Sequence, residues 1–450
     1  MALQAAIEHY HALLTDDLGG ETQAQLDDQL RRRGLFFGER PLCNVLRPRF
    51  LTPDQYRFLK ARCALLLRAF GKVYDAALAD EGFRRQFRLM DWEEALIRHD
   101  PGFRDPSPVS RLDAFFVPER GGLRFTEYNA ETPAATAYND LLATVFFGLP
   151  VMREFLKRYE VRQQPSRHNV LHALVDAYHQ ASGRRDVPRI AIIDWRDVPT
   201  YSEFVITADY FRSQGVECVI ADPREVEYRG GRLYAGGLAV DLVYKRVLVS
   251  ELVERGGLDH PVVRAVVDGA VCMVNSFRCK VLHKKASLAV LSDERNAGLF
   301  DAEEREAIEA HVPWTRVVEE RRTVYDGREV DLVPFVAEHR EHLVLKPNDE
   351  YGGAGIVLGW QCDAGAWEAA LRQALEVPFI VQDRIALPEE AYPRFVDGRV
   401  VFHEGIIDTA PFAFYGAYVD GCLTRLSSDA LVNVTAGGGS SLATFVVEPR

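Results

Sequence analysis

Cysteine and methionine are scarce in the sequence, and no long hydrophobic run occurs. The 450 residues include 7 cysteines and 4 methionines, and no two cysteines form a Cys-x-x-Cys pair. Neither a zinc site at sulfur nor a disulfide framework is therefore indicated, and we expect reduced thiols. The longest uncharged apolar run, residues 141–152, is shorter than the roughly 20 residues of a membrane-spanning helix and contains Gly148 and Pro150. No membrane partner is expected.

An excess of positive charge is lacking as well. Lys and Arg total 54 against 66 Asp and Glu, which gives a formal net charge of -12 and no reason to expect a nucleic-acid partner. The first residues contain Glu8 and no basic leader before an apolar core, so a cytoplasmic location is expected. With 47% hydrophobic and 27% charged residues, the composition is typical of a compact globular protein. At this length about three domains are expected.

The pattern of apolar residues divides the chain into four regions. The first is mainly helical and contains a helix start at Thr52, which is followed by Pro53. The second opens with a ribbon of two alternating strands. The third alternates strand and helix, which predicts a small Rossmann-like α/β layer. The fourth combines helices with β-prone runs and predicts an antiparallel α+β unit. The expected bounds of the four regions are 1–110, 111–183, 184–270 and 271–450.

Individual elements are expected within these regions. The ribbon covers residues 111–132 with a turn at 119–122, and whether it joins the sheet of the fourth region is an open structural question. The third region is expected to contain strands at 189–194, 217–222 and 241–246 and a helix at 203–214. The β-prone runs of the fourth region lie at 342–346, 356–360, 379–384, 399–407, 412–419 and 431–435.

The most informative motif is LVLKPNDEYGGAGIVLGW, in which a strand ends at Lys346 and Pro347 and a loop contains Gly352, Gly353 and Gly355. A hairpin tip of glycines can place backbone N–H groups on phosphate oxygens, while the lysine supplies a fixed positive charge. The motif is not a P-loop, and no G-x-G-x-x-G occurs. A plain hairpin with a glycine turn is an equally good interpretation of this motif alone.

A second set of residues lies in the ribbon. In an extended chain Arg111 and Asp113 share a face, and so do Glu127 and Asn129, so both pairs can project toward one point. Oxygen ligands of this kind form an incomplete Mg²⁺ site that nucleotide phosphates and water complete. Arg111 would hold a phosphate or carboxylate bidentately. The alternative is a set of cross-strand ion pairs on an exposed ribbon.

Three weaker signals follow in the third and fourth regions. The segment NSFRCKVLHKK contains Lys280, Lys284 and Lys285, one of which we expect to face an anion, the alternative being a solvated basic helix face. The strand FIVQDRI turns polar at Gln382 and Asp383, as expected where a sheet edge or hinge meets adenine and ribose, although a bland edge strand fits equally.

Near the end of the sequence, Arg425 and the LVNVTAGGGSS segment suggest a loop that approaches something closely, with a flexible glycine turn as the alternative. The histidines form no metal set, because His339 and His342 lack the H-E-x-x-H order. No Ser-His-Asp or Cys-His nucleophile system is evident. The chemistry is therefore expected to be electrostatic.

Together, the motifs RLD, FTEYNAETP, KPNDEYGGAG and NVTAGGG resemble the ATP-grasp superfamily. In ordinary members the Lys-Pro strand precedes the acidic E-x-N motif, whereas here Glu127 and Asn129 precede Lys346. The chain therefore looks circularly permuted, and it resembles the synthetase domain of glutathionylspermidine synthase over about residues 40–450. The resemblance implies a circularly permuted ATP-grasp fold of antiparallel sheets with flanking helices, joined to a Rossmann-like domain and a helical N-terminal segment.

The resemblance also implies roles for individual residues, with ATP and Mg²⁺ as cofactors. Asp113, Glu127 and Asn129 would hold the metal. Arg111, Lys346 and Arg425 would act on the transferred phosphate and the acyl-phosphate. The nucleotide would be bound by Lys285, or less surely by Lys284 or Lys280, and by Lys346, Gly352, Gly353, Gly355, Gln382 and Asp383.

The activity implied is that of an ATP-dependent carboxylate-amine ligase, which makes an amide through an acyl-phosphate and releases ADP and phosphate. A small-molecule carboxylate and an amine would be the partners, with the amine held around Asp194, Glu203 and residues 244–246. The alternative for the two acids is a helix cap or a surface charge. A glutathione or polyamine site is not recognisable, so the substrates stay open. The alternatives are a small-molecule kinase and a catalytically silent nucleotide-binding protein.

Overall fold

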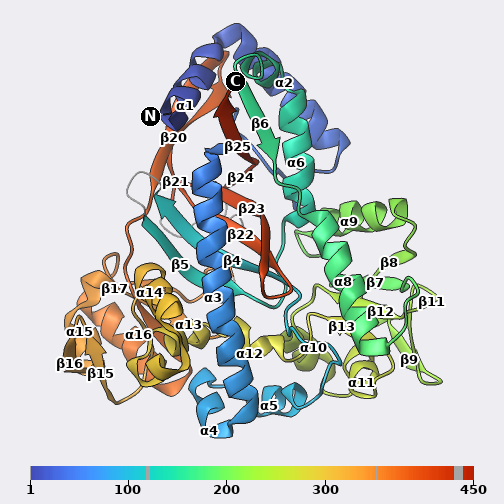
Figure 1. Cartoon of the computed structure of the whole chain (residues 1–450), viewed down its shortest axis with the longest axis vertical. Helices are drawn as coiled ribbons and strands as arrows, with labels where there is room; N and C mark the ends of the chain where they lie inside the picture. Colours follow the sequence, from blue (N-terminus) through green and yellow to red (C-terminus); the bar gives the residue numbers. More distant parts are fainter. Residues whose placement is uncertain (1, 118–121, 351, 430–438) are drawn as a thin grey trace.

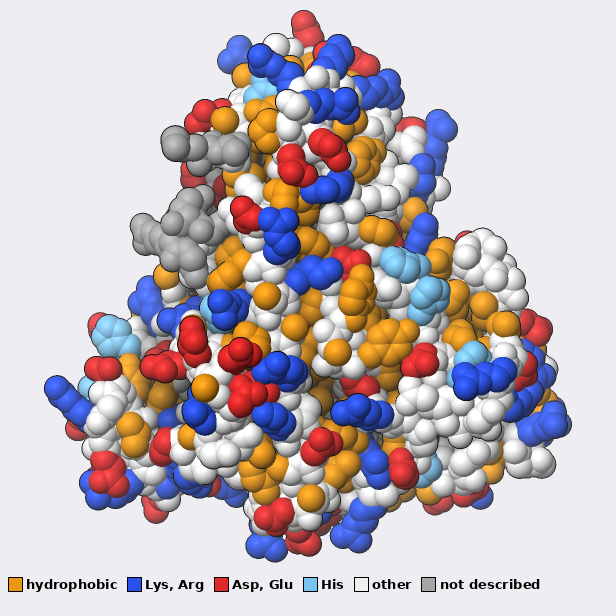
Figure 2. Space-filling view, in the orientation of Figure 1, with side chains coloured by type: hydrophobic (Ala, Val, Ile, Leu, Met, Phe, Trp, Pro, Cys, Tyr) orange, Lys and Arg blue, Asp and Glu red, His pale blue; other side chains and the backbone are white. Residues whose placement is uncertain are grey.

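The computed structural model describes residues 2–117, 122–350, 352–429 and 439–450. Figure 1 shows a central antiparallel sheet with three groups of elements around it: one at the apex, one around β17 and one around β12. The two ends of the chain lie together at the apex. On the face drawn in Figure 2, acidic and basic side chains are intermingled over all three groups. None of the helices in the described ranges has an apolar stretch that would reach across a bilayer.

The central sheet answers the question that the ribbon poses. Its strand order is β20-β21-β23-β22-β4-β5, with β24 added beside β23. The ribbon strands β4 and β5 pair with each other, and Phe412 of β22 pairs with Arg111 of β4. The ribbon and the last third of the chain therefore form one sheet. The strands are β4 Val109–Val117, β5 Gly122–Asn129, β20 Glu389–Val396, β21 Arg399–Ile407, β22 Ala410–Phe414, β23 Tyr418–Ser427 and β24 Ser440–Leu442.

One face of this sheet is covered by the long helix α3, Pro53–Ala79 (Figure 1). Thr52 caps it as the sequence predicts, since its hydroxyl accepts from the Gln55 amide and the Gln55 side chain accepts from the Thr52 amide. Apolar residues of α3, such as Phe70, pack in one buried cluster with Leu112 and Phe125 of the ribbon. The other helices of this layer are α4 Glu81–Arg84, α5 Asp91–Ile97 and α12 Cys279–His283.

The group around β17 is built on a four-stranded antiparallel sheet in the order β14-β19-β17-β18. Trp367 is fully buried in its core and donates from its indole nitrogen to the Val336 carbonyl. Its strands are β14 Thr315–Val317, β17 Leu343–Pro347, β18 Val357–Leu358 and β19 Phe379–Asp383, with the hairpin β15 Arg322–Tyr325 and β16 Arg328–Asp331. Its helices are α13 Ala286–Ser292, α14 Ala302–His311, α15 Leu332–Glu338 and α16 Ala364–Glu376.

The group around β12 contains an all-parallel sheet in the order β13-β12-β7-β8. The three strands expected in the third region are present, and β13 is an additional fourth strand that the sequence pattern did not indicate. Bounds are β7 Ile190–Ile193, β8 Cys218–Ala221, β12 Leu242–Lys245 and β13 Cys272–Val274; α8 Arg167–Ser182, α9 Tyr201–Ser213, α10 Val249–Gly256 and α11 Pro261–Val267; and the small sheet β9 Glu227–Arg229, β10 Arg232–Ala235 and β11 Leu238–Ala239.

The apex joins segments that are far apart in sequence. Strand β25 pairs in parallel with β3 and antiparallel with β6. The sequence pattern did not indicate these three strands, because each is short and lies beside helices or a chain end. The apex contains α1 Ala2–Leu13, α2 Asp16–Arg32, β1 Phe36–Phe37, β2 Arg40–Pro41, β3 Arg49–Leu51, α6 Thr136–Gly148, α7 Pro150–Phe155, β6 Tyr159–Gln163 and β25 Thr444–Pro449.

The single strand expected at 412–419 is wrong, because Tyr415 and Gly416 have φ angles of 56° and 61° and form a turn between β22 and β23. The strand expected at 431–435 and most of the turn expected at 119–122 lie outside the described residues. The mixed α/β character of the chain is confirmed, while the proposed domain bounds stay a prediction.

Candidate active site

A cavity of about 400 Å³ lies where the central sheet, the β17 group and the β12 group meet. Its middle is lined by charged residues of β4, β5 and β23, including Arg111, Glu127 and Arg425. One end reaches Lys346 and Gly352, and the other end reaches the parallel sheet. Most of the residues predicted for the site therefore line one space, although the sequence spreads them over more than half of the chain.

The paired strands β4 and β5 place the four ribbon residues opposite one another. Arg111 is paired with Asn129, and Asp113 with Glu127, and all four line the cavity. A bulge directly after Asp113 shifts the register of the two strands. Because a bulge increases the local twist of a strand, it changes the direction of the side chains beside it, here next to the cavity.

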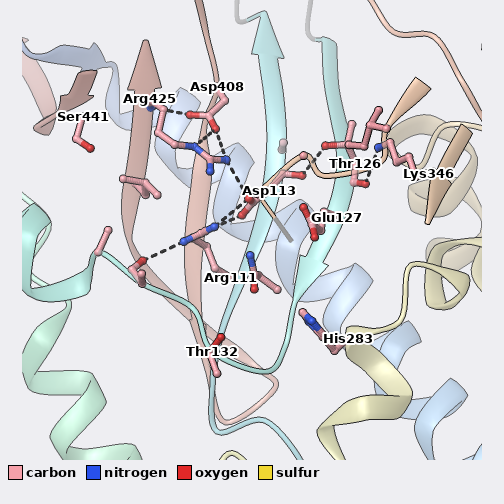
Figure 3. Close-up of a pocket in the computed structure, with 18 of the residues that line it drawn as sticks. Arg111, Asp113, Thr126, Glu127, Thr132, His283, Lys346, Asp408, Arg425 and Ser441 are labelled. Atoms are coloured by element: carbon pink, nitrogen blue, oxygen red, sulfur yellow. Dashed lines mark hydrogen bonds and ion pairs between the residues drawn. The ribbon is translucent and has the colours of Figure 1, made fainter. Parts of the chain in front are cut away.

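Asp113 is held by two arginines. Arg111 donates to it bidentately, from Nε at 2.6 Å and from Nη2 at 2.9 Å, and Arg425 Nη2 donates at 2.9 Å (Figure 3). Burial by itself would raise the pKa of Asp113, but the two guanidinium groups outweigh it and lower the pKa to about 2. Asp113 is therefore a fixed anion that orients both arginines along the cavity.

Asp408 orients Arg425 in turn, and the sequence offered no signal for it. The carboxylate is 2% exposed and accepts from the Arg425 amide and from Arg425 Nε, each at 2.6 Å. Burial raises the pKa of Asp408, and Arg425 opposes that effect. The arginine is thus clamped between Asp408 and Asp113, which leaves its direction well defined.

The remaining oxygen ligands of the predicted metal site are less encumbered. Glu127 lies 3.1 Å from Lys285 Nζ, and its side chain keeps 25% of its surface exposed. Burial would raise the pKa of Glu127, but Lys285 and Lys346 together help to outweigh burial, and the pKa is lowered. Within the described chain, the Asn129 side chain makes no hydrogen bond, and no three His, Cys, Asp or Glu residues are grouped as a metal site.

This donor set fits Mg²⁺. Glu127 offers a carboxylate and Asn129 an amide oxygen, and Oδ1 of Asp113 accepts only one hydrogen bond in the structure. Three protein oxygens with open positions beside them are what a Mg²⁺ ion shared with phosphates requires. Asp113 differs from the other two because it is already engaged by arginines.

Lys346 lies beside the ribbon at the other end of the cavity. Its Nζ donates to Gln382 Oε1 at 2.7 Å and to the Thr126 carbonyl at 3.3 Å. Burial lowers the pKa of Lys346 to about 8, although the nearby Glu127 acts in the opposite direction. A lysine whose charge is this poorly compensated is suited to bind an anion.

The three lysines of the 275–285 segment separate into two kinds. Lys280 lies 2.7 Å from Asp349 and 3.2 Å from Glu131, and Lys284 lies 2.8 Å from Asp349. Both lysines are 2% exposed or less and are neutralised in this buried cluster. Lys285 alone of the three forms an ion pair with a cavity residue, Glu127.

The glycine loop and strand β19 both carry residues that were predicted to bind the nucleotide. Gly352 and Gly353 line the cavity with φ angles of 65° and 78°, and a Cβ at Gly355 would meet Pro347 Cγ at 2.7 Å. The expectation of a sheet edge at Gln382 is wrong, because β19 pairs with β14 on one side and with β17 on the other.

Gln382 nevertheless lines the cavity, where its side chain anchors Lys346. Asp383 lines it too, and burial raises the pKa of this carboxyl to about 6. Apolar side chains also line the cavity together with these two residues. They are Val344, Ile356, Leu358, Trp360, Ile385 and Leu387.

At the parallel sheet, the residues proposed for the amine behave differently from one another. Asp194 and Arg246 line the cavity. Glu203 does not, since it accepts from the Ala135 amide at 2.7 Å and from the Ala137 amide at 3.3 Å, at the start of α6. Glu203 is therefore a helix cap.

His283 also lines the cavity and was not singled out from the sequence. Burial lowers its pKa to about 4, and its Nδ1 is buried without a hydrogen-bond partner in the described structure. The imidazole is thus neutral over the physiological range. No sequence pattern marked it, because it is brought to the cavity by the short helix α12.

Comparison with known proteins shows the fold and nothing finer. No family model matches the chain, and no curated protein does. A glutathione synthetase-like effector from Globodera pallida, solved in its apo form, matches with a TM-score of 0.59 over 95% of this chain and 96% of that one, at 11% identity. The chain therefore shares the overall fold of that protein. A D-alanyl-alanine synthetase A from Vibrio cholerae covers 50% of this chain at 10% identity, and its TM-score of 0.26 carries no argument.

Proposed function

We propose that the protein is an ATP- and Mg²⁺-dependent carboxylate-amine ligase with a circularly permuted ATP-grasp fold. The observation that carries the proposal is the contact of Lys346 with strand β5. Lys346 Nζ donates to the carbonyl of Thr126, which directly precedes Glu127 and lies 220 residues from Lys346 in the sequence. The motif order and the fold shared with a protein described as glutathione synthetase-like support it.

The nucleotide would lie along the β17 end of the cavity. The adenine ring would lie against the apolar side chains around Trp360, with the Asp383 carboxylate near the ribose. Lys346, Lys285 and the backbone N–H groups of the glycine loop would surround the phosphates. These groups neutralise the charge that develops on the β- and γ-phosphates during transfer.

Glu127, Asn129 and the free side of Asp113 would hold Mg²⁺ against the phosphates. When bound, the ion withdraws charge from the transferred group. Arg111 and Arg425, both fixed by Asp113, would stabilise the phosphoryl group while the oxygen of the substrate carboxylate attacks it. The products of this step are an acyl-phosphate and ADP.

In the second step, the nitrogen of a neutral amine attacks the acyl carbon, the carbon–oxygen bond to phosphate breaks, and the departing phosphate takes the proton that the nitrogen loses. An acyl-phosphate hydrolyses in open water, so the site must close around it. The glycine loop, which borders the cavity, is positioned to do so. No covalent intermediate with the protein is needed.

The first test uses thermal stability, because it needs no knowledge of the substrates. Ligand at 100 times its dissociation constant adds about 2.7 kcal/mol to the folded state. We expect Mg-ATP to stabilise the wild type, Lys346→Ala to lose most of this effect, and Lys157→Ala, which removes an exposed lysine, to keep it. Absence of any shift in the wild type would leave a protein without nucleotide chemistry.

The second test identifies the reaction. Pools of acids and amines are screened for release of both ADP and phosphate, followed by mass spectrometry of the product. A ligase releases both in equal amounts only when acid and amine are present together. Release of ADP with a stable phosphorylated product and without phosphate would instead show a small-molecule kinase.

A further inference from the structure

Arg246 is a buried arginine on the cavity wall that forms no direct ion pair within the described residues. It directly follows β12, its amide donates to the Ile193 carbonyl, and its side chain is among the buried charged groups at 7% exposure. One guanidinium nitrogen, Nη1, donates to the Pro133 carbonyl and reaches the Tyr244 hydroxyl at 3.4 Å. Glu203 and Asp194 lie near enough to help raise the pKa of Arg246, but neither forms a direct ion pair with it in the described ranges.

The other guanidinium nitrogens of Arg246, Nε and Nη2, have no hydrogen-bond partner within the described structure. Arg246 itself lines the cavity. A buried guanidinium group with two unused N–H donors is costly unless an anion occupies it, and its planar fork matches a carboxylate. Arg111 lies nearby, since it donates to the carbonyl of Ala134, the residue after Pro133. The two arginines thus flank one short segment of chain.

A negative group stands next to Arg246. Asp194 follows β7, lines the same end of the cavity, and uses one oxygen to accept from the Trp195 amide at 2.8 Å. Its second oxygen has no hydrogen-bond partner in the part of the chain that the structure describes. Glu251, which accepts from the Trp195 indole at 3.0 Å, adds negative charge at the same wall. The cavity end therefore offers a cation and anions side by side.

The remaining lining at this end is apolar. Phe37, Leu42, Val198, Pro199 and Leu248 face the cavity around the charged groups. A simple amine would leave Arg246 unpaired, and a simple acid would leave Asp194 unpaired. A ligand that carries both an ammonium and a carboxylate next to an apolar group pairs every one of these features.

We propose that this end of the cavity binds an α-amino acid with an apolar side chain as the amine substrate. Its carboxylate pairs with Nε and Nη2 of Arg246, its ammonium with Asp194, and its side chain contacts the apolar wall. The inference rests on the proposed ligase function, in which the ammonium group gives one proton to Asp194 before the nitrogen attacks the acyl carbon, and the departing phosphate takes the second proton. Arg246 is thus assigned to carboxylate recognition and not to holding the amine nitrogen.

The test compares three ligands of nearly equal size: L-leucine, its decarboxylated form isoamylamine, and its deaminated form 4-methylpentanoate. The same set is measured for valine and phenylalanine. Dissociation constants are determined by calorimetry with and without saturating Mg-ADP. We expect at least one amino acid to bind at least tenfold more tightly than both of its analogues. The proposal is overturned if the amine analogue or the acid analogue binds as tightly as the amino acid. It is also overturned if no amino acid binds at about 10 mM.

Variants make the assignment specific. Arg246→Gln is expected to remove the preference for the amino acid over the amine and to leave binding of the amine unchanged, whereas Asp194→Asn is expected to remove the preference over the acid. Arg246→Lys, which keeps the charge and loses the fork, serves if the glutamine variant fails to fold. Arg232→Gln removes an exposed arginine of the same group and is the matched control.

The Mg-ATP stabilisation of each variant is measured on the same samples. If the variants keep this stabilisation while the wild type shows no preference for amino acids, only the subsite proposal fails. If the wild type lacks the Mg-ATP effect, the proposed function itself fails. The two results are thereby distinguished.

Discussion

Arg425 Nη2 lies 2.9 Å from Asp113 Oδ2, although 312 residues separate them in the sequence. The strands that carry them, β23 and β4, are not neighbours, since β22 lies between them in the central sheet. The ion pair therefore spans the sheet on the cavity side and joins the predicted metal motif to the C-terminal third of the chain. It explains why a carboxylate and an arginine expected in separate roles act as one unit.

Asp408 is predicted to matter through Arg425. Asp408→Asn places an amide N–H against a guanidinium group and loses a charge-assisted hydrogen bond, so we expect a loss of about 1–3 kcal/mol in the free energy of unfolding. Turnover should fall at least tenfold, while the affinity for Mg-ADP stays close to that of the wild type. Urea unfolding, ADP release and calorimetry measure the three quantities. Asp259→Asn, at an exposed position, is the control, and an unchanged turnover in Asp408→Asn contradicts the prediction.

Lys346 predicts a pH dependence of nucleotide binding. Its pKa of about 8 means that the charged form is lost as pH rises through that value in the free protein. Because phosphates favour the charged lysine, the affinity for Mg-ADP should fall by up to about tenfold per pH unit above pH 8. In Lys346→Arg the group stays charged, so the profile should be flat over this range. The affinity for Mg-ADP is measured by calorimetry between pH 7 and roughly 9.5. A flat wild-type profile would show that Lys346 does not contact the phosphates.

Asn129 offers the cleanest test of the metal site, because its side chain has no hydrogen bond to lose in the described structure. Asn129→Ala should raise the Mg²⁺ concentration needed for half-maximal nucleotide binding by at least tenfold, with little change in stability. Asn44→Ala, which truncates an exposed asparagine, should behave as the wild type. Titration of Mg²⁺ at fixed ADP measures the effect. The same Mg²⁺ requirement in both variants would remove Asn129 from the site.

The three lysines of the 275–285 segment should separate by experiment as they do in the structure. Lys280→Met leaves the buried Glu131 and the partly buried Asp349 without this counter-ion, so we expect a loss of about 3–5 kcal/mol in unfolding free energy. Lys285→Met removes the ion pair with the partly exposed Glu127 and a hydrogen bond to the Glu350 carbonyl, so it should cost less stability, but it should weaken Mg-ADP binding. Urea unfolding and calorimetry on both proteins decide. The reverse pattern would assign nucleotide contact to Lys280.

Local patterns in the sequence anticipated several elements of the fold. Alternation over residues 111–132 predicted the two strands β4 and β5, and Thr52 with Pro53 marks a helix start, because both features depend on neighbours within a few residues. The sheet of β3, β25 and β6 left no such trace. Its strands are short, and their pairing depends on contacts between segments hundreds of residues apart.

Which side chains share a face of the ribbon could be predicted from the sequence, because side chains two residues apart in a strand lie on the same face. The residues on this face are Arg111, Asp113, Glu127 and Asn129. Only the tertiary structure decided that Lys285 meets Glu127 while Lys280 is neutralised. The fold also brings Asp408 against Arg425 and leaves Arg246 without a direct ion pair in the described chain. These outcomes depend on which charges are buried together, and burial of distant partners is a property of the folded chain and not of local spacing.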